Sequence, residues 1–94
     1  MITVGMNYEI LNGKERIFEK AFQSVLQVMR EMPGHQQSSL YKDVHKPSFY
    51  LILSEWSDRT AFDAFIRSER FAKVVTWGKE QILASRPRHQ IYGT

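Results

Sequence analysis

Three side chains in this 94-residue sequence have the types and positions that could perform chemistry: Asn7, His35 and Trp56. Asn7 interrupts an alternating apolar segment, where an amide is unfavourable to bury unless it is hydrogen-bonded. Its N–H groups could orient a substrate oxygen or stabilise a developing phenolate-type anion. The alternative is a structural hydrogen bond to a neighbouring element, and the sequence weighs the two about equally.

His35 and Trp56 are candidates of different kinds. His35 is the candidate general base, because an imidazole titrates near neutral pH, and Tyr41 is a second titratable group on the same polar segment. Trp56 ends an apolar run, so its ring could form a pocket wall with the indole N–H donating to a substrate. An aromatic residue that only closes the core is the favoured alternative for Trp56.

A set of phenylalanines would line any apolar pocket between helices and sheet. The same spacing is more typical of residues that simply fill a core. The set comprises Phe22, Phe62, Phe65 and Phe71.

Several chemistries are excluded by what the sequence lacks. The chain has no cysteine, so disulfides, thiol catalysis and iron–sulfur clusters are ruled out. Its five glycines are isolated, which excludes a glycine-rich phosphate loop. Its three histidines do not lie at the spacing of a metal site. The sequence therefore predicts neither a cofactor nor a metal.

The charge pattern could favour an anionic partner or substrate, but a solvated helix face with a basic tail is the favoured interpretation. The net charge of +3 comes from a basic C-terminal third, but the apolar run at residues 48–53 lacks the basic-glycine-aromatic signature of RNA-recognition strands. No uncharged stretch is long enough to span a membrane, and no secretion signal is visible. We expect no nucleic-acid or membrane partner and a cytoplasmic location.

Two periodicities define the elements that must position the candidate residues. Apolar and polar residues alternate in strands, whereas apolar residues recur at three- and four-residue steps in helices. These patterns predict strands at residues 2–10, 35–44, 48–56 and 88–92, and helices at 14–32 and from Ser57 to a stop at Pro87. Ser57 is the predicted cap of the second helix, and Ser68 is a point where that helix can break and restart. The apolar run at 48–56 predicts a central strand buried on both faces.

The order β-α-β-β-α-β is that of an α+β, ferredoxin-like fold. It predicts a four-stranded antiparallel sheet with the helices on one face, in a single domain over residues 1–94. So small a core is often supplemented by association, and the strands carry apolar side chains on both sides. We therefore expect a homodimer.

The chain resembles the antibiotic biosynthesis monooxygenase family, whose members are dimeric α+β barrels. The resemblance is carried by the alternating segment that ends at Asn7, the Met-Pro-Gly break at residues 32–34, and the runs at residues 55–62 and 68–71. It implies a dimer whose two sheets form a barrel, with a pocket between sheet and helices in each subunit. Several members oxygenate quinols or polycyclic phenols with O₂ and no metal or flavin, and one branch binds and degrades haem.

The resemblance also shows where this chain departs from its relatives. Many members carry histidines at the positions of Phe65 and Arg70. The iron-ligating histidine of the haem branch aligns with Val75, which cannot bind iron but would lie in the pocket with Tyr41. The resemblance therefore favours a site without haem.

Two functions of different classes follow. The first is a cofactor-independent monooxygenase that acts with O₂ on an electron-rich quinol or phenol in the pocket between sheet and helices. The second is a non-catalytic small-molecule-binding or stress-related dimer, which the missing helical histidines favour. The retained Asn7 and Trp56 favour the first. Haem binding or degradation is a third and weaker alternative.

Overall fold

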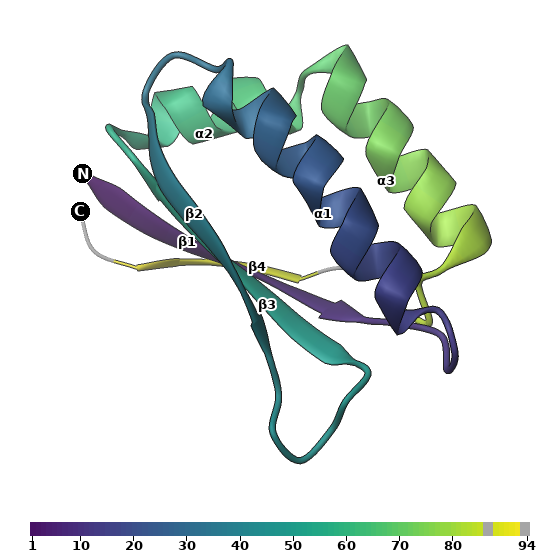
Figure 1. The fold of residues 1–94 in the computed structure, drawn as a ribbon. Coiled ribbons are helices and arrows are strands. Elements are labelled where there is room, and N and C mark those ends of the chain that lie inside the picture. The colour runs from purple at the N-terminus through teal and green to yellow at the C-terminus, as the bar shows by residue number, and fades with distance from the viewer. Residues whose placement is uncertain (86–87, 93–94) are drawn as a thin grey trace.

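The computed structural model describes residues 1–85 and 88–92. Its elements are β1 (Ile2–Glu9), α1 (Glu15–Arg30), β2 (His35–Lys42), β3 (Phe49–Trp56), α2 (Arg59–Ile66), α3 (Glu69–Gln81) and β4 (Arg88–Tyr92). The strands pair antiparallel in the order β2-β3-β1-β4, and the helices lie over one face of the sheet (Figure 1). The predicted ferredoxin-like fold is confirmed. None of the helices in the described residues has the length and hydropathy needed to cross a membrane.

The second helical region is broken in two, and a capping side chain begins each part. The Asp58 carboxylate accepts a hydrogen bond from the Ala61 N–H at 2.8 Å, so α2 is capped one residue later than the predicted Ser57. The Ser68 hydroxyl accepts from the Phe71 N–H at 3.2 Å and starts α3, as predicted. Pro87, the predicted stop, lies outside the described residues.

The alternation of side chains along β1 determines which residues lie on each face of the sheet. Ile2, Val4 and Met6 are buried beneath the helices, and their register partners on β3 are buried with them. The intervening side chains, such as Thr3 and Asn7, point to the other face because successive strand residues alternate. We call that second face, which no helix covers, the open face.

The central position of β3 is confirmed, but its predicted burial on both faces holds for one face in the single chain. Tyr50, Ile52 and Trp56 are buried beneath the helices. Phe49 and Leu51 lie on the open face and stay partly exposed. The reason is that this chain supplies a helical layer for one side of the sheet only.

Candidate functional site

The structure divides the predicted site residues among three places. His35, Trp56 and the phenylalanines at 62, 65 and 71 form an aromatic cluster beneath α2. Phe22 and Val75 line a narrow slot between the helices and the sheet. Asn7 and Tyr41 line a hollow on the open face. The predicted residues therefore do not meet in one pocket.

Trp56 is the centre of the aromatic cluster and is 0% exposed. Its ring centroid lies 5.8 Å from that of Phe62 and 5.4 Å from that of Phe65, and Phe71 packs on Phe65 at 4.5 Å. The indole N–H donates to the Ser54 hydroxyl at 3.0 Å. Since that N–H is already paired inside the core, this geometry matches the core-closing alternative for Trp56.

His35 lies at the edge of the same cluster. Its ring meets Trp56 edge-on, with centroids 5.1 Å apart, and its Nε2 lies 2.7 Å from the Ser38 hydroxyl. That hydroxyl donates to the Met29 sulfur at 3.4 Å, so it is arranged to accept from Nε2–H. Burial, and then the charge of Arg30, lower the pKa of His35 below its ordinary value. The imidazole is therefore neutral at pH 7, the form that a general base requires.

The slot lies between α1, α3 and the helix-covered face of the sheet. Its volume is about 40 Å³ and its lining is apolar apart from two side chains, Tyr8 and Trp77. The lining comprises Tyr8, Phe18, Ala21, Phe22, Val25, Ile52, Val74, Val75, Trp77, Gly78, Ile82 and Leu83. A benzene ring occupies a cavity of about 150 Å³ in a protein core, so an aromatic ligand requires the slot to widen.

Tyr8 is the buried polar group of the slot. Its hydroxyl donates to the Met6 sulfur at 3.9 Å, a weak acceptor. Burial raises the pKa of the Tyr8 phenol above its ordinary value, so the group remains a neutral donor. Trp77, by contrast, is 40% exposed and also lines a groove on the outer surface of α1 and α3.

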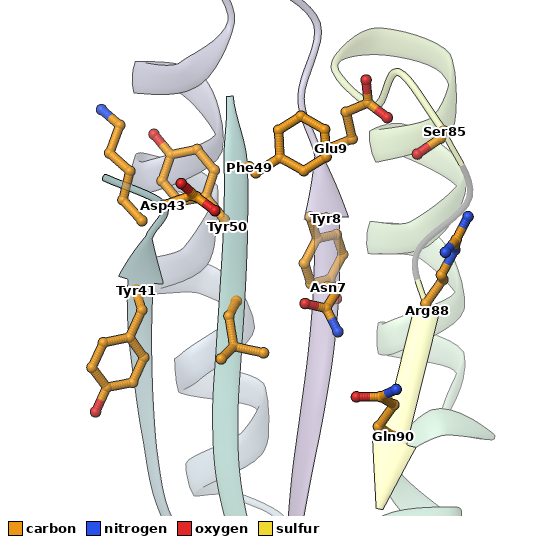
Figure 2. Close-up of a pocket in the computed structure, with 12 residues that line it drawn as sticks. Asn7, Tyr8, Glu9, Tyr41, Asp43, Phe49, Tyr50, Ser85, Arg88 and Gln90 are labelled. Carbon is orange, nitrogen blue, oxygen red and sulfur yellow. The ribbon is translucent and has the colours of Figure 1, made fainter. Parts of the chain in front are cut away.

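The hollow on the open face holds about 630 Å³ and is lined by several polar and charged side chains. Figure 2 shows Tyr41, Asn7, Arg88 and Gln90 on three strands around it. The strand registers align Tyr41 with Leu51, Leu51 with Asn7, and Asn7 with Arg88. We call the line that crosses the whole sheet through Tyr41, Leu51, Asn7 and Arg88 the cross-strand row.

Sequence reasoning missed Tyr8, Trp77 and Arg88. Tyr8 and Trp77 match strand and helix patterns of ordinary core residues, and nothing in their types marks them as lining a cavity. A signal for Arg88 was present, since β1 and β4 are neighbours in a ferredoxin-like sheet. Placing Arg88 opposite Asn7 nevertheless requires the register, which the sequence does not provide.

The fold and its cavities define an α+β, ferredoxin-like protein with an apolar slot under the helices and a polar hollow on the open face. The chain belongs to the antibiotic biosynthesis monooxygenase family, whose model matches residues 1–77.

Two haloarchaeal relatives have names that propose heme binding. The chain is 34% identical to the Haloquadratum walsbyi protein and 36% identical to the Halobacterium salinarum protein, each over 87 residues. The match covers 93% of this chain but only 16% and 18% of those proteins. The chain thus spans about a sixth of the length of these relatives, whose names describe much longer proteins.

Solved structures share the fold at low sequence identity. SnoaB, a cofactor-independent oxygenase from Streptomyces nogalater, is 18% identical with a TM-score of 0.85, over 99% of this chain and 91% of SnoaB. A conserved protein from Methanosarcina mazei Go1 is 23% identical with a TM-score of 0.87, over 97% and 89% of the two chains. At these identities the likeness shows the fold alone.

Proposed function

We propose that the protein is a cofactor-independent oxygenase that accepts an electron-rich quinol or phenol in the slot between helices and sheet. The observation that supports this most directly is the buried Tyr8 hydroxyl in a lining that is apolar except for Trp77, held only by a weak bond to sulfur. A substrate oxygen is a better acceptor than the Met6 sulfur and would take that hydrogen bond.

The reaction needs no electrons beyond those of the substrate. A quinol and O₂ give a hydroxyquinone and water: one oxygen atom enters the ring, the other leaves as water, and the quinol supplies all four electrons. The quinol enters the slot as its monoanion, its proton having passed to water, and gives the first electron to O₂. The protein then has to exclude water, orient the substrate oxygen and stabilise its negative charge.

The slot excludes water and orients the substrate oxygen, and it supplies part of the stabilisation of the negative charge. Phe22 and Val75 are walls of a water-poor cavity, and the Tyr8 hydroxyl orients the oxygen and stabilises its charge. Trp77 is the most exposed residue of the lining, so its side of the slot is the one that opens to admit a ring.

The residues of the slot do not fit haem. Its lining contains no histidine, and Val75 stands on α3 where the haem branch has its ligand. His35 is packed against Trp56 outside the lining, and His45 lies in the turn between β2 and β3. We therefore derive no step through haem, in spite of the names of the haloarchaeal relatives.

Non-catalytic binding of a small apolar molecule is the second candidate. It is favoured by a specific observation: Tyr8 is the one ionisable side chain among the residues that line the slot. A binder of this kind would retain affinity for aromatic ligands but consume no O₂.

The decisive experiment measures O₂ uptake with a panel of quinols in metal-free buffer, together with ligand affinity. Val75→Phe fills the slot and should abolish both uptake and binding. Val44→Phe adds the same bulk at an exposed turn residue outside the slot and serves as the control. Binding without uptake supports the second candidate, and uptake that survives Val75→Phe contradicts the slot as the site.

We also propose that two copies pair through their open faces. Tyr41 and Tyr92 are 52% and 49% exposed there, beside the partly exposed Phe49 and Leu51. Exposed apolar area of this kind indicates an association surface. Sedimentation equilibrium at micromolar concentration should give about twice the monomer mass of 11.1 kDa. A mass near 11 kDa would contradict the pairing.

A further inference from the structure

We propose that the groove on the outer surface of α1 and α3 is the entrance to the slot and selects substrates whose aromatic ring carries a short acidic side chain. The inference rests on the proposed function, because it assigns a substrate class to the same slot. The groove holds about 350 Å³ and is lined by Ile17, Lys20, Ala21, Ser24, Val74 and Trp77. It belongs to the helical layer (Figure 1), so pairing of two open faces on the other side of the sheet leaves it accessible.

The groove and the slot share a wall. Ala21, Val74 and Trp77 line both cavities, so the interior of the slot and the outer surface meet at these three side chains. Ala21 contributes only a methyl group on the α1 side, and Trp77 is the most exposed of the three on the α3 side. A rotation of the Trp77 side chain therefore joins the two cavities. A ring that lies in the slot can then keep a substituent in the groove.

The outer walls of the groove suit a short hydrocarbon linker. Ile17 on α1 and Trp77 on α3 are 42% and 40% exposed, although both are large apolar side chains. Methylene groups that lie between them would remove apolar surface from water, which is favourable at about 25 cal/mol per Å². The groove therefore holds the chain that connects a ring to its acidic end.

Two donors on α1 flank the entrance. Lys20 and Ser24 lie one helical turn apart, which places their Cβ atoms about 5–6 Å from each other on the same helix face. Both are exposed, and neither side chain has an ion pair or a hydrogen bond within the described residues. An ammonium group beside a hydroxyl matches the two oxygens of a carboxylate.

The nearby acidic side chains leave these donors available. Glu19 precedes Lys20 in the sequence, but its carboxylate accepts from the Tyr50 hydroxyl on the sheet side of α1. Glu80 follows Trp77 by three residues and does not line the groove. Among the residues that line the groove, Lys20 is the one that carries a charge. The entrance is therefore positive and favours an anionic substituent.

The test compares two probes of the same shape, 4-phenylbutanoate and its neutral counterpart 4-phenylbutanamide. Each offers a ring to the slot, and only the first carries a negative charge. We expect the acid to bind about fivefold more tightly, the scale of one exposed ion pair. Calorimetry and amide NMR shifts at residues 20–24 and 74–77 measure this. Added salt should reduce the preference, because the groove is open to solvent.

Two variants of Lys20 change the charge at the entrance in steps. Lys20→Gln should abolish the preference for the acid, and Lys20→Glu should reverse it, so that the amide binds about fivefold more tightly. Lys79→Gln removes the same charge from α3 outside both linings and should leave the preference unchanged. Val75→Phe fills the slot and should abolish binding of both probes. Circular dichroism checks that each variant is folded.

Four results would overturn the inference: no binding of either probe at millimolar concentration, equal binding of the two, a preference that survives Lys20→Gln, or binding that Val75→Phe leaves unchanged. None of these measurements involves O₂ uptake. Uptake with neutral quinols and no preference for the acid contradicts this inference alone. A preference for the acid without uptake for any quinol contradicts the oxygenase and supports the selection of acids at the entrance.

Discussion

Two buried tyrosines that face each other across β1 and β3 provide a matched test of the slot. Tyr8 and Tyr50 are register partners, 9% and 3% exposed, and both rings pack on Phe18. Their hydroxyl groups differ: that of Tyr8 reaches only the Met6 sulfur at 3.9 Å, whereas that of Tyr50 donates to the Glu19 carboxylate at 2.5 Å. Removing each hydroxyl therefore removes a different interaction from a similar environment.

The expected free energies follow from those partners. A buried hydroxyl without a good acceptor costs about 1–3 kcal/mol to desolvate, and a bond to sulfur offsets little of this. Tyr8→Phe should leave the free energy of unfolding unchanged or raise it by up to about 1 kcal/mol. Tyr50→Phe loses a charge-assisted bond, but Glu19 is half-exposed and screened by solvent, so the loss should be about 1 kcal/mol.

Thermal and denaturant unfolding measure both variants. For a domain of this size about 1 kcal/mol shifts Tm by roughly 4–8 °C, so the two variants should move in opposite directions or differ by several degrees. If this result is obtained, the Tyr8 hydroxyl does not stabilise the fold. A polar group that does not stabilise the fold is typical of a functional residue. A Tyr8→Phe loss of more than about 1 kcal/mol would show a structural hydrogen bond and refute the reasoning.

Further predictions concern the backbone, pH and haem. Gly34→Ala should cost clearly more than Gly13→Ala: both glycines have φ near 90°, but a Cβ at Gly34 would lie 2.5 Å from the Ala61 Cβ, whereas the space at Gly13 is open. Denaturant midpoints compare the two. Because burial raises the pKa of both buried phenols, stability should fall above about pH 10 as the unfolded chain deprotonates first, by up to about 1.4 kcal/mol per pH unit for each. NMR titration of His35 should give a midpoint below 6.5, since burial disfavours its charged form, and the stability it contributes should be lost as pH falls through that midpoint. Titration with haemin should give no stoichiometric Soret shift and, with reductant under air, no iron release; either would contradict the fit of the slot residues.

Most of the fold could be predicted because local patterns and global topology agree. Alternation over residues 2–10 predicted β1, and the strand at 88–92 was placed with the observed bounds. The errors are at element ends: the first helix ends at Arg30 rather than at residue 32, and Asp58 rather than Ser57 caps α2. Both residues can cap a helix, and the choice depends on backbone angles that the residue types do not determine.

The candidate site was less predictable because it depends on which face of the sheet each residue joins. The sequence placed Asn7 opposite the apolar side chains of the first strand, and the structure agrees. The family resemblance, however, implied a pocket under the helices, and Asn7 cannot reach that side. The apolar residues of β1 need the helical layer for burial, so the polar alternates are directed to the open face.

The placement of Asn7 and Tyr8 makes the slot and the hollow on the open face separable by experiment. They are consecutive residues of β1, so their side chains lie on opposite faces of the sheet, Asn7 in the row and Tyr8 in the slot. If the reaction takes place in the slot, Tyr8→Phe removes the donor to the substrate oxygen and should lower turnover by about 10²-fold, the scale of one lost donor to a developing anion. If it takes place in the row, the same loss should follow Asn7→Ala instead. Measuring kcat on both variants therefore assigns the reaction to one face, and a turnover loss confined to Asn7→Ala would contradict the slot as the reaction site.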